Sequence, residues 1–165
     1  MRTKGTGGML ATGALVLLLG APAAAQQLEK QGTYSAKYGW TLSSTVHKVE
    51  DGHVFTHDVY KGTIFNDAGK GFLHEASNVC YGVSDLIQGK GDAHGYCVVT
   101  DKNNDKAFLV WKGTIDPATG FQGTYQWTGG TGQYTGLKGN NTFQATLIGA
   151  SSEGRALQKG EWQLP

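Results

Sequence analysis

The feature of this sequence that most constrains its fold is a glycine-rich stretch, residues 125–139, that lies between two alternating segments. Before the glycines, Tyr125 and Trp127 fall on one side of an extended chain and Gln126 on the other, which is typical of a strand with one buried face. Three glycines within residues 129–132 allow backbone torsions that are closed to other residues, so they predict a corner between strands. A phosphate-binding loop is excluded, because no Gly-Lys-Ser/Thr ending is present and no helical pattern follows.

Alternating segments separated by turn residues continue along the chain from about residue 31, and none has helical periodicity. In the first segment, the apolar face consists of Tyr34, Ala36, Tyr38, Trp40, Leu42 and Val46. Eight strands are predicted, at residues 32–49, 53–66, 72–85, 94–100, 106–115, 121–128, 140–148 and 156–164. Eight antiparallel strands with short turns favour a closed barrel, which leaves no exposed edge, and a two-sheet sandwich is the alternative.

The N-terminal residues have the pattern of a secretory signal peptide. Arg2 and Lys4 precede an apolar run within residues 9–19, and a segment of small residues ends at Ala25. The run is too short for a transmembrane helix. We therefore expect cleavage near Ala25, a single β-barrel domain at residues 26–165, and a periplasmic or secreted product that is not inserted in a membrane.

The charge balance argues against a nucleic-acid partner. The chain has 14 basic and 13 acidic side chains, and removal of residues 1–25 takes away only Arg2 and Lys4, which leaves 12 against 13 and a net charge of −1. Such a chain produces no field that would gather nucleic acid or anionic lipid. Nothing in the sequence indicates an oligomeric state.

The two cysteines, Cys80 and Cys97, are expected to form a disulfide, because the predicted compartment is oxidising. Their midpoint falls in the predicted turn at residues 88–91, so they can face each other across a hairpin. Closing such a loop stabilises the fold by about 3 kcal/mol in the chain-entropy model. A redox-active pair is disfavoured, because the Cys-x-x-Cys spacing is absent.

Aromatic residues dominate the faces that we expect to point inward, and they are the candidate ligand-binding residues. An eight-stranded barrel is just wide enough to be filled by side chains or to hold one small ligand, so a packed core and an aromatic-lined cavity both fit. The candidates are Tyr34, Tyr38, Trp40, Tyr125, Trp127, Phe143 and Trp162.

No metal or cofactor is predicted. His47, His53 and His57 lie near one hairpin, but they lack the short fixed spacing of known zinc motifs, and exposed strand histidines are the favoured interpretation. The segment at residues 101–105 matches only the first half of a calcium loop, so we expect a turn in which Asp and Asn side chains bond their own backbone.

Asp58 and Glu75 are weak candidates for catalysis, because both fall within predicted strands, where a carboxylate is unusual. An inward carboxylate would have a raised pKa and could act as a general acid or base. The second strand carries apolar residues on both sides, so its alternation does not fix the direction of Asp58.

The glycine-rich stretch also resembles a known signature. The pattern Gly129-Gly130-Thr131-Gly132-x-Tyr134-x-Gly136-x-x-Gly139 is similar to that of dirigent proteins and of bacterial proteins with an allene oxide cyclase-like barrel. Residues 95–101 and 104–108 also look like the bacterial members, and the resemblance covers most of the chain after residue 30. It implies an all-β fold, an eight-stranded antiparallel closed barrel that is calycin-like in architecture.

The resemblance and the aromatic faces together predict an exported barrel that binds a small apolar or aromatic molecule. The alternative is a cyclase or isomerase without a redox cofactor, or a dirigent-like stereochemical guide, in the same cavity. Plant allene oxide cyclases close a ring inside such a barrel and dirigent proteins steer radical coupling, but the positions that match here are turn residues and carry no catalytic role across. A structural envelope protein with a filled core is the second alternative.

Overall fold

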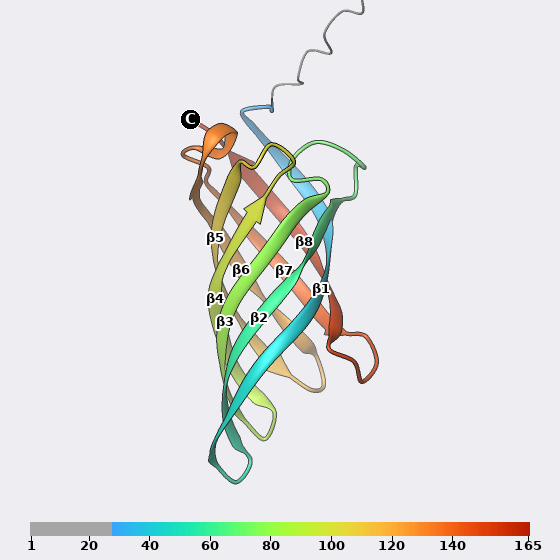
Figure 1. Ribbon diagram of the computed structural model, residues 1–165, viewed down its shortest axis with the longest axis vertical. Coiled ribbons are helices and arrows are strands. Elements are labelled where there is room, and N and C mark those ends of the chain that lie inside the picture. The colour runs from blue at the N-terminus through green and yellow to red at the C-terminus, as the bar shows by residue number, and fades with distance from the viewer. Residues whose placement is uncertain (1–27) are drawn as a thin grey trace, which may run out of the picture.

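The computed structural model describes residues 28–165, which form a closed barrel in which each strand pairs antiparallel with its neighbours in sequence and the last with the first (Figure 1). The predicted closed barrel is confirmed, and the sandwich alternative is wrong. The predicted signal peptide, residues 1–25, lies outside the described residues. The strands are β1 Gln31–Glu50, β2 His53–Asn66, β3 Ala76–Ile87, β4 Lys90–Thr100, β5 Lys106–Asp116, β6 Gly120–Gly130, β7 Gly139–Leu147 and β8 Glu153–Gln163.

Alternation along each strand determines which side chains point into the barrel. In β1, Tyr34, Ala36, Tyr38 and Trp40 are buried, whereas most residues between them are exposed. The pairing register keeps the inward faces together, because Tyr38 lies opposite Ile64 of β2, which is also buried. A two-residue repeat in the sequence thus becomes an apolar interior and a mostly polar outer wall.

The predicted inward face of β1 is too long at its C-terminal end. Val46 is 60 % exposed, although its parity matches that of the buried residues. The hairpin of β1 and β2 extends beyond the neighbouring strands (Figure 1), so there is no opposite wall against which Val46 can pack.

The two ends of the barrel differ in how the strands are connected (Figure 1). One end, the turn end, has only short connections, at residues 51–52, 88–89, 117–119 and 148–152. The other, the loop end, carries the C-terminus, the short 3₁₀ helix η1 (Gly132–Tyr134) and the longer connections at residues 67–75, 101–105 and 131–138. No helix among residues 28–165 is long and apolar enough to cross a membrane.

The segment at residues 72–75 was predicted as the start of the third strand, and this is wrong. The strand begins at Ala76, and Leu73 and Glu75 have positive φ values of 52° and 58°, which coil the chain before it. Phe72 and Leu73 are buried, whereas Glu75 is exposed in the loop. Glu75 is therefore not a mid-strand residue.

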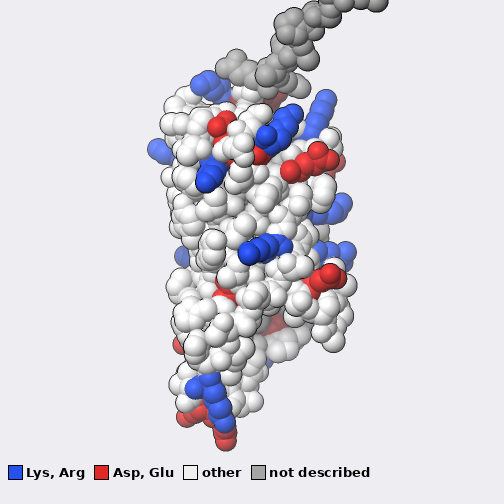
Figure 2. Space-filling view, viewed as in Figure 1, with Lys and Arg blue, Asp and Glu red and all other residues white. Residues whose placement is uncertain are grey.

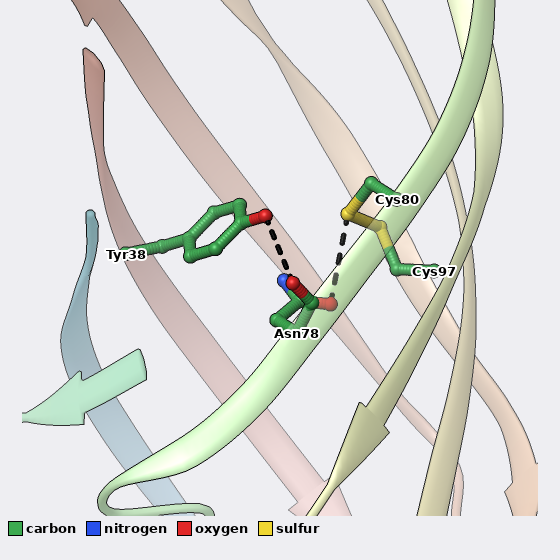
Figure 3. Close-up of a disulfide and its surroundings, with 4 residues drawn as sticks. All are labelled: Tyr38, Asn78, Cys80 and Cys97. Atoms are coloured by element: carbon green, nitrogen blue, oxygen red, sulfur yellow. Dashed lines mark hydrogen bonds between the residues drawn. A yellow bond between two sulfur atoms is a disulfide. The ribbon is translucent and has the colours of Figure 1, made fainter. Parts of the chain in front are cut away.

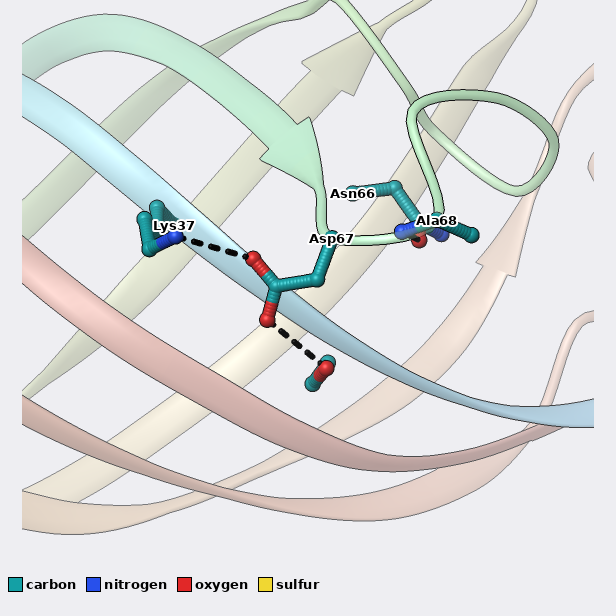
Figure 4. Close-up of polar contacts among 5 residues, drawn as sticks. Lys37, Asn66, Asp67 and Ala68 are labelled. Carbon is teal, nitrogen blue, oxygen red and sulfur yellow. Dashed lines mark hydrogen bonds and ion pairs between the residues drawn. The ribbon is translucent and has the colours of Figure 1, made fainter.

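Polar contacts at the end of β2 hold this loop in place. The Asn66 side chain accepts a hydrogen bond from the Ala68 N–H (3.0 Å) and donates one to the Phe72 carbonyl oxygen (3.0 Å), which folds residues 67–72 back over the barrel. Asp67 lies beside Lys37 of β1, with 3.4 Å between Nζ and Oδ1 (Figure 4). A hydrogen bond from Ser35 and this ion pair lower the pKa of the Asp67 carboxyl.

The predicted disulfide is confirmed. Cys80 of β3 lies directly opposite Cys97 of β4, and the two sulfur atoms are bonded. Both side chains are buried and point into the barrel. The bridge therefore connects neighbouring strands across one hairpin, as its midpoint in the sequence predicted.

Charged side chains of both signs are interspersed over the outer surface. Figure 2 shows Lys and Arg beside Asp and Glu on the visible face, without a large area of one sign. The ion pairs between side chains include Lys37–Asp67 and Lys90–Asp116.

Candidate functional site

The barrel interior contains two adjoining cavities toward the turn end. The inner cavity, of about 60 Å³, is walled mainly by rings, and the outer cavity, of about 350 Å³, lies between it and the turns at residues 117–119. The two share the side chains of Trp40, Tyr60, Phe121 and Ala145. The outer volume is within the range of small-molecule sites. The rings around the inner cavity are Tyr38, Trp40, Tyr60, Trp111, Phe121, Tyr125 and Phe143.

Inward-facing glycines leave room for these rings against the wall. A Cβ on Gly82 would lie 2.4 Å from the Trp111 ring, and a Cβ on Gly95 would lie 2.6 Å from it, so the indole occupies space that other residues would fill. Trp40 packs in the same way on Gly154 of β8, where an added Cβ would lie 2.1 Å from the indole ring. Because the large rings lie on glycine, the barrel is lined by aromatic groups without being filled at the turn end.

The loop end is closed by a packed aromatic cluster that we call the plug. It is centred on Phe72, which stacks on Trp162 with 4.7 Å between ring centroids and an angle of 4°. Phe72 also makes edge contacts with Tyr34 (5.1 Å) and Trp127 (5.6 Å). The plug therefore leaves the turn end as the route into the cavities.

Tyr38 and the disulfide form one side of the inner cavity (Figure 3). The Tyr38 hydroxyl points from β1 toward β3 and donates a hydrogen bond to the Asn78 carbonyl oxygen, at 3.3 Å. Asn78 Oδ1 lies 3.6 Å from the Cys80 sulfur. Burial raises the pKa of Tyr38 and Tyr125, so these phenols stay neutral hydrogen-bonding groups in the physiological range.

Asp58 of β2 lies at the boundary of the outer cavity and faces the interior. Its side chain is buried, and its carboxylate accepts hydrogen bonds from three hydroxyl groups, those of Ser44 (2.6 Å), Thr56 (2.7 Å) and Ser84 (3.1 Å). Tyr60 is two residues away on the same face, and burial together with the Asp58 charge raises its pKa. The cavity thus presents a carboxylate and a neutral phenol beside apolar rings.

One polar group of the inner cavity has no protein partner. The indole N–H of Trp111 is buried and makes no hydrogen bond within residues 28–165. A buried donor without an acceptor costs about 1–3 kcal/mol.

Comparison with protein-family models gives no match, and comparison with curated proteins gives none either. Among solved structures, the barrel is similar to that of a pterocarpan synthase dirigent protein, with a TM-score of 0.52 over 82 % of this chain and 87 % of that chain. The fold is a dirigent-like barrel. The two sequences are only 10 % identical, so the likeness establishes the architecture of the dirigent-like barrel and leaves its activity open.

The structure distributes the predicted ligand-binding residues over two regions of the dirigent-like barrel. Tyr38, Trp40, Tyr125 and Phe143 line the inner cavity. The other three candidates, Tyr34, Trp127 and Trp162, pack in or beside the plug instead. Tyr34 and Tyr125 connect the two regions through a hydrogen bond between their hydroxyl groups.

Several lining residues were not identified from the sequence. Tyr60 and Trp111 are the aromatic residues of a short internal similarity, residues 60–64 and 111–115, and this repeated pattern was the available signal for them. Ser44, Thr56 and Ser84 gave no signal, because small polar residues in strands are ordinary. Asp58 was a candidate whose direction the alternation of β2 left open, and the barrel turns it inward.

The histidines and the segment at residues 101–105 lie outside the cavities. His47 and His57 contact each other on the exposed β1–β2 hairpin, and His53 bonds Asp85 instead. Within the described residues no group of three or more potential metal ligands is found. Asp101 accepts hydrogen bonds from the N–H groups of residues 103 and 105, at 2.8 and 3.0 Å, so the segment forms a turn.

Proposed function

We propose that this protein is exported and binds one small apolar or aromatic molecule in the cavities of its barrel. The observation that carries the proposal is an aromatic-lined interior that is closed at the loop end by the plug and accessible from the turn end. The disulfide fits an exported protein, since such bonds persist in oxidising compartments.

Thermal unfolding in the presence of a panel of lipophilic aromatic compounds tests this proposal. A ligand at 100 times its Kd raises the unfolding free energy by about 2.7 kcal/mol. For a domain of this size, that corresponds to about 8 °C in Tm. No shift with any compound of the panel would count against binding.

A matched pair of variants locates the effect in the cavity. Ala145 faces both cavities, so Ala145→Leu fills space that a guest would occupy. Gln144→Leu places the same side chain on the exposed outer face, one residue away. We expect the shift to disappear in A145L and to remain in Q144L. Equal shifts in the two variants would place binding elsewhere and contradict the proposal.

A second candidate function is a cyclase, isomerase or stereochemical guide without a redox centre of its own. The Asp58 carboxylate and the Tyr60 phenol favour it, because both residues line the same cavity and carry groups that can exchange a proton with a guest. The dirigent-like fold is compatible with it. Conversion of a bound guest that is lost in Asp58→Asn and Tyr60→Phe, with binding retained, would support catalysis. Unchanged conversion would exclude these two residues.

The filled-core alternative, a purely structural envelope protein, receives less support. An outer cavity of about 350 Å³ is large for a protein interior whose only task is stability, because interiors are normally close-packed.

A further inference from the structure

Asp58 lines the outer cavity, and its carboxylate has no cationic partner among the described residues. It is only 6 % exposed. Its Oδ1 accepts a hydrogen bond from Ser44, and its Oδ2 accepts two, from Thr56 and Ser84. A carboxylate offers about four lone-pair positions, so one position on Oδ1 remains free. Burying a negative charge without a positive partner is costly, so this residue needs an explanation beyond packing.

No Lys, Arg or His lines either cavity. The other acidic residue at the outer cavity, Asp116, is already paired with Lys90, at 3.2 Å. The interior therefore carries a negative charge that the described part of the chain does not neutralise, and it would repel an anionic guest.

Aromatic rings line the same cavity as Asp58. The rings of Trp40 and Tyr60 lie 5.2 Å apart at 88° to each other, and Phe121 completes the boundary between the two cavities. Cations are attracted to the faces of Trp, Tyr and Phe, and the attraction is stronger where water is excluded. Because the Tyr60 phenol stays neutral, it adds a ring to this site without adding a second negative charge.

We infer that the guest of the cavity carries a protonated amine on an apolar or aromatic body. Its N–H⁺ donates to Oδ1 of Asp58, its charge lies against the rings of Trp40 and Tyr60, and its apolar body occupies the ring-lined space. This inference rests on the proposed binding function and specifies the chemical class of the ligand.

Three probes of one shape and different charge test the inference by isothermal titration calorimetry at pH 7: 2-naphthylmethylamine, 2-naphthylmethanol and 2-naphthoic acid. We expect the amine to bind about tenfold to a hundredfold more tightly than the alcohol, the range for a charge-assisted hydrogen bond, and the acid most weakly. Asp58→Asn should abolish the preference for the amine. Asp85→Asn, which removes an exposed carboxylate of the same sheet, should preserve it.

The outcomes separate this inference from the proposed function. Equal affinities of the wild-type protein for the amine and the alcohol overturn the inference and leave ligand binding intact, and this result does not depend on whether any variant folds. A preference for the amine that persists in a folded D58N variant also overturns it. If none of the three probes binds at millimolar concentration, both the inference and the proposed binding of an aromatic guest are wrong.

Discussion

Phe72→Ala is the substitution that most directly tests how the barrel is closed. Phe72 comes from a loop between two strands, yet its ring is buried and stacks on Trp162 near the C-terminus. It also contacts the rings of Tyr34 and Trp127. The substitution removes the centre of the plug and leaves each strand and its hydrogen bonds in place.

The expected loss follows from the burial of the ring. Truncating a buried Phe to Ala in a protein core costs about 3–5 kcal/mol, which combines lost transfer energy with the cavity left behind. We expect a value in this range, because four rings surround the position and come from four different elements, β1, β6, η1 and β8, so the space cannot collapse easily. For a domain of this size, the loss corresponds to a decrease in Tm of about 10–15 °C.

Chemical denaturation followed by circular dichroism measures this loss, under conditions that keep the disulfide intact. Phe65→Ala is the matched control, since Phe65 lies on the outer face of β2 near the same loop and is 48 % exposed. We expect F65A to lose less than about 1 kcal/mol, as is usual for surface substitutions. A loss in F72A no larger than that in F65A would refute the role of Phe72 as the centre of the plug.

Three further outcomes are expected. Replacing both Cys80 and Cys97 with Ala should lower the free energy of unfolding by about 2–4 kcal/mol. If the variant were less stable than the reduced wild-type protein by the same amount, the loss would not come from the cross-link. Gly154→Ala should push Trp40 into the cavity and cost about 1–3 kcal/mol, whereas Gly39→Ala, with open space around its Cβ position, should be nearly neutral; similar losses in the two would refute the packing of the ring on glycine. Burial holds the folded-state pKa of five tyrosines above the ordinary value of about 10. As the pH rises, these tyrosines therefore lose their protons in the unfolded chain before they do so in the folded barrel. The stability that they contribute is fully present below about pH 10 and decreases at higher pH. Phenolate absorbance from the five should therefore appear together with loss of near-ultraviolet circular dichroism, and its appearance in a folded barrel would contradict their burial; they are Tyr34, Tyr38, Tyr60, Tyr125 and Tyr134.

The sequence by itself determined the number of strands, their antiparallel order and the disulfide. These features depend on local patterns: a two-residue repeat that separates an apolar from a polar face, turn residues between segments, and two cysteines equidistant from one turn. Each can be evaluated within a hairpin, because neighbouring strands in this barrel are also neighbours in sequence.

The tertiary structure alone decided how the interior is divided into a plug and a cavity. The local sequence predicts a strand at Phe72, whereas in the structure its ring stacks on Trp162, 90 positions later in the chain. Trp40 leaves space at the turn end because it lies on Gly154, and no local pattern relates those two residues. Contacts across a closed cylinder join residues that are distant in sequence, so the position of each ring, and the direction in which Asp58 points, are fixed only when the last strand pairs with the first.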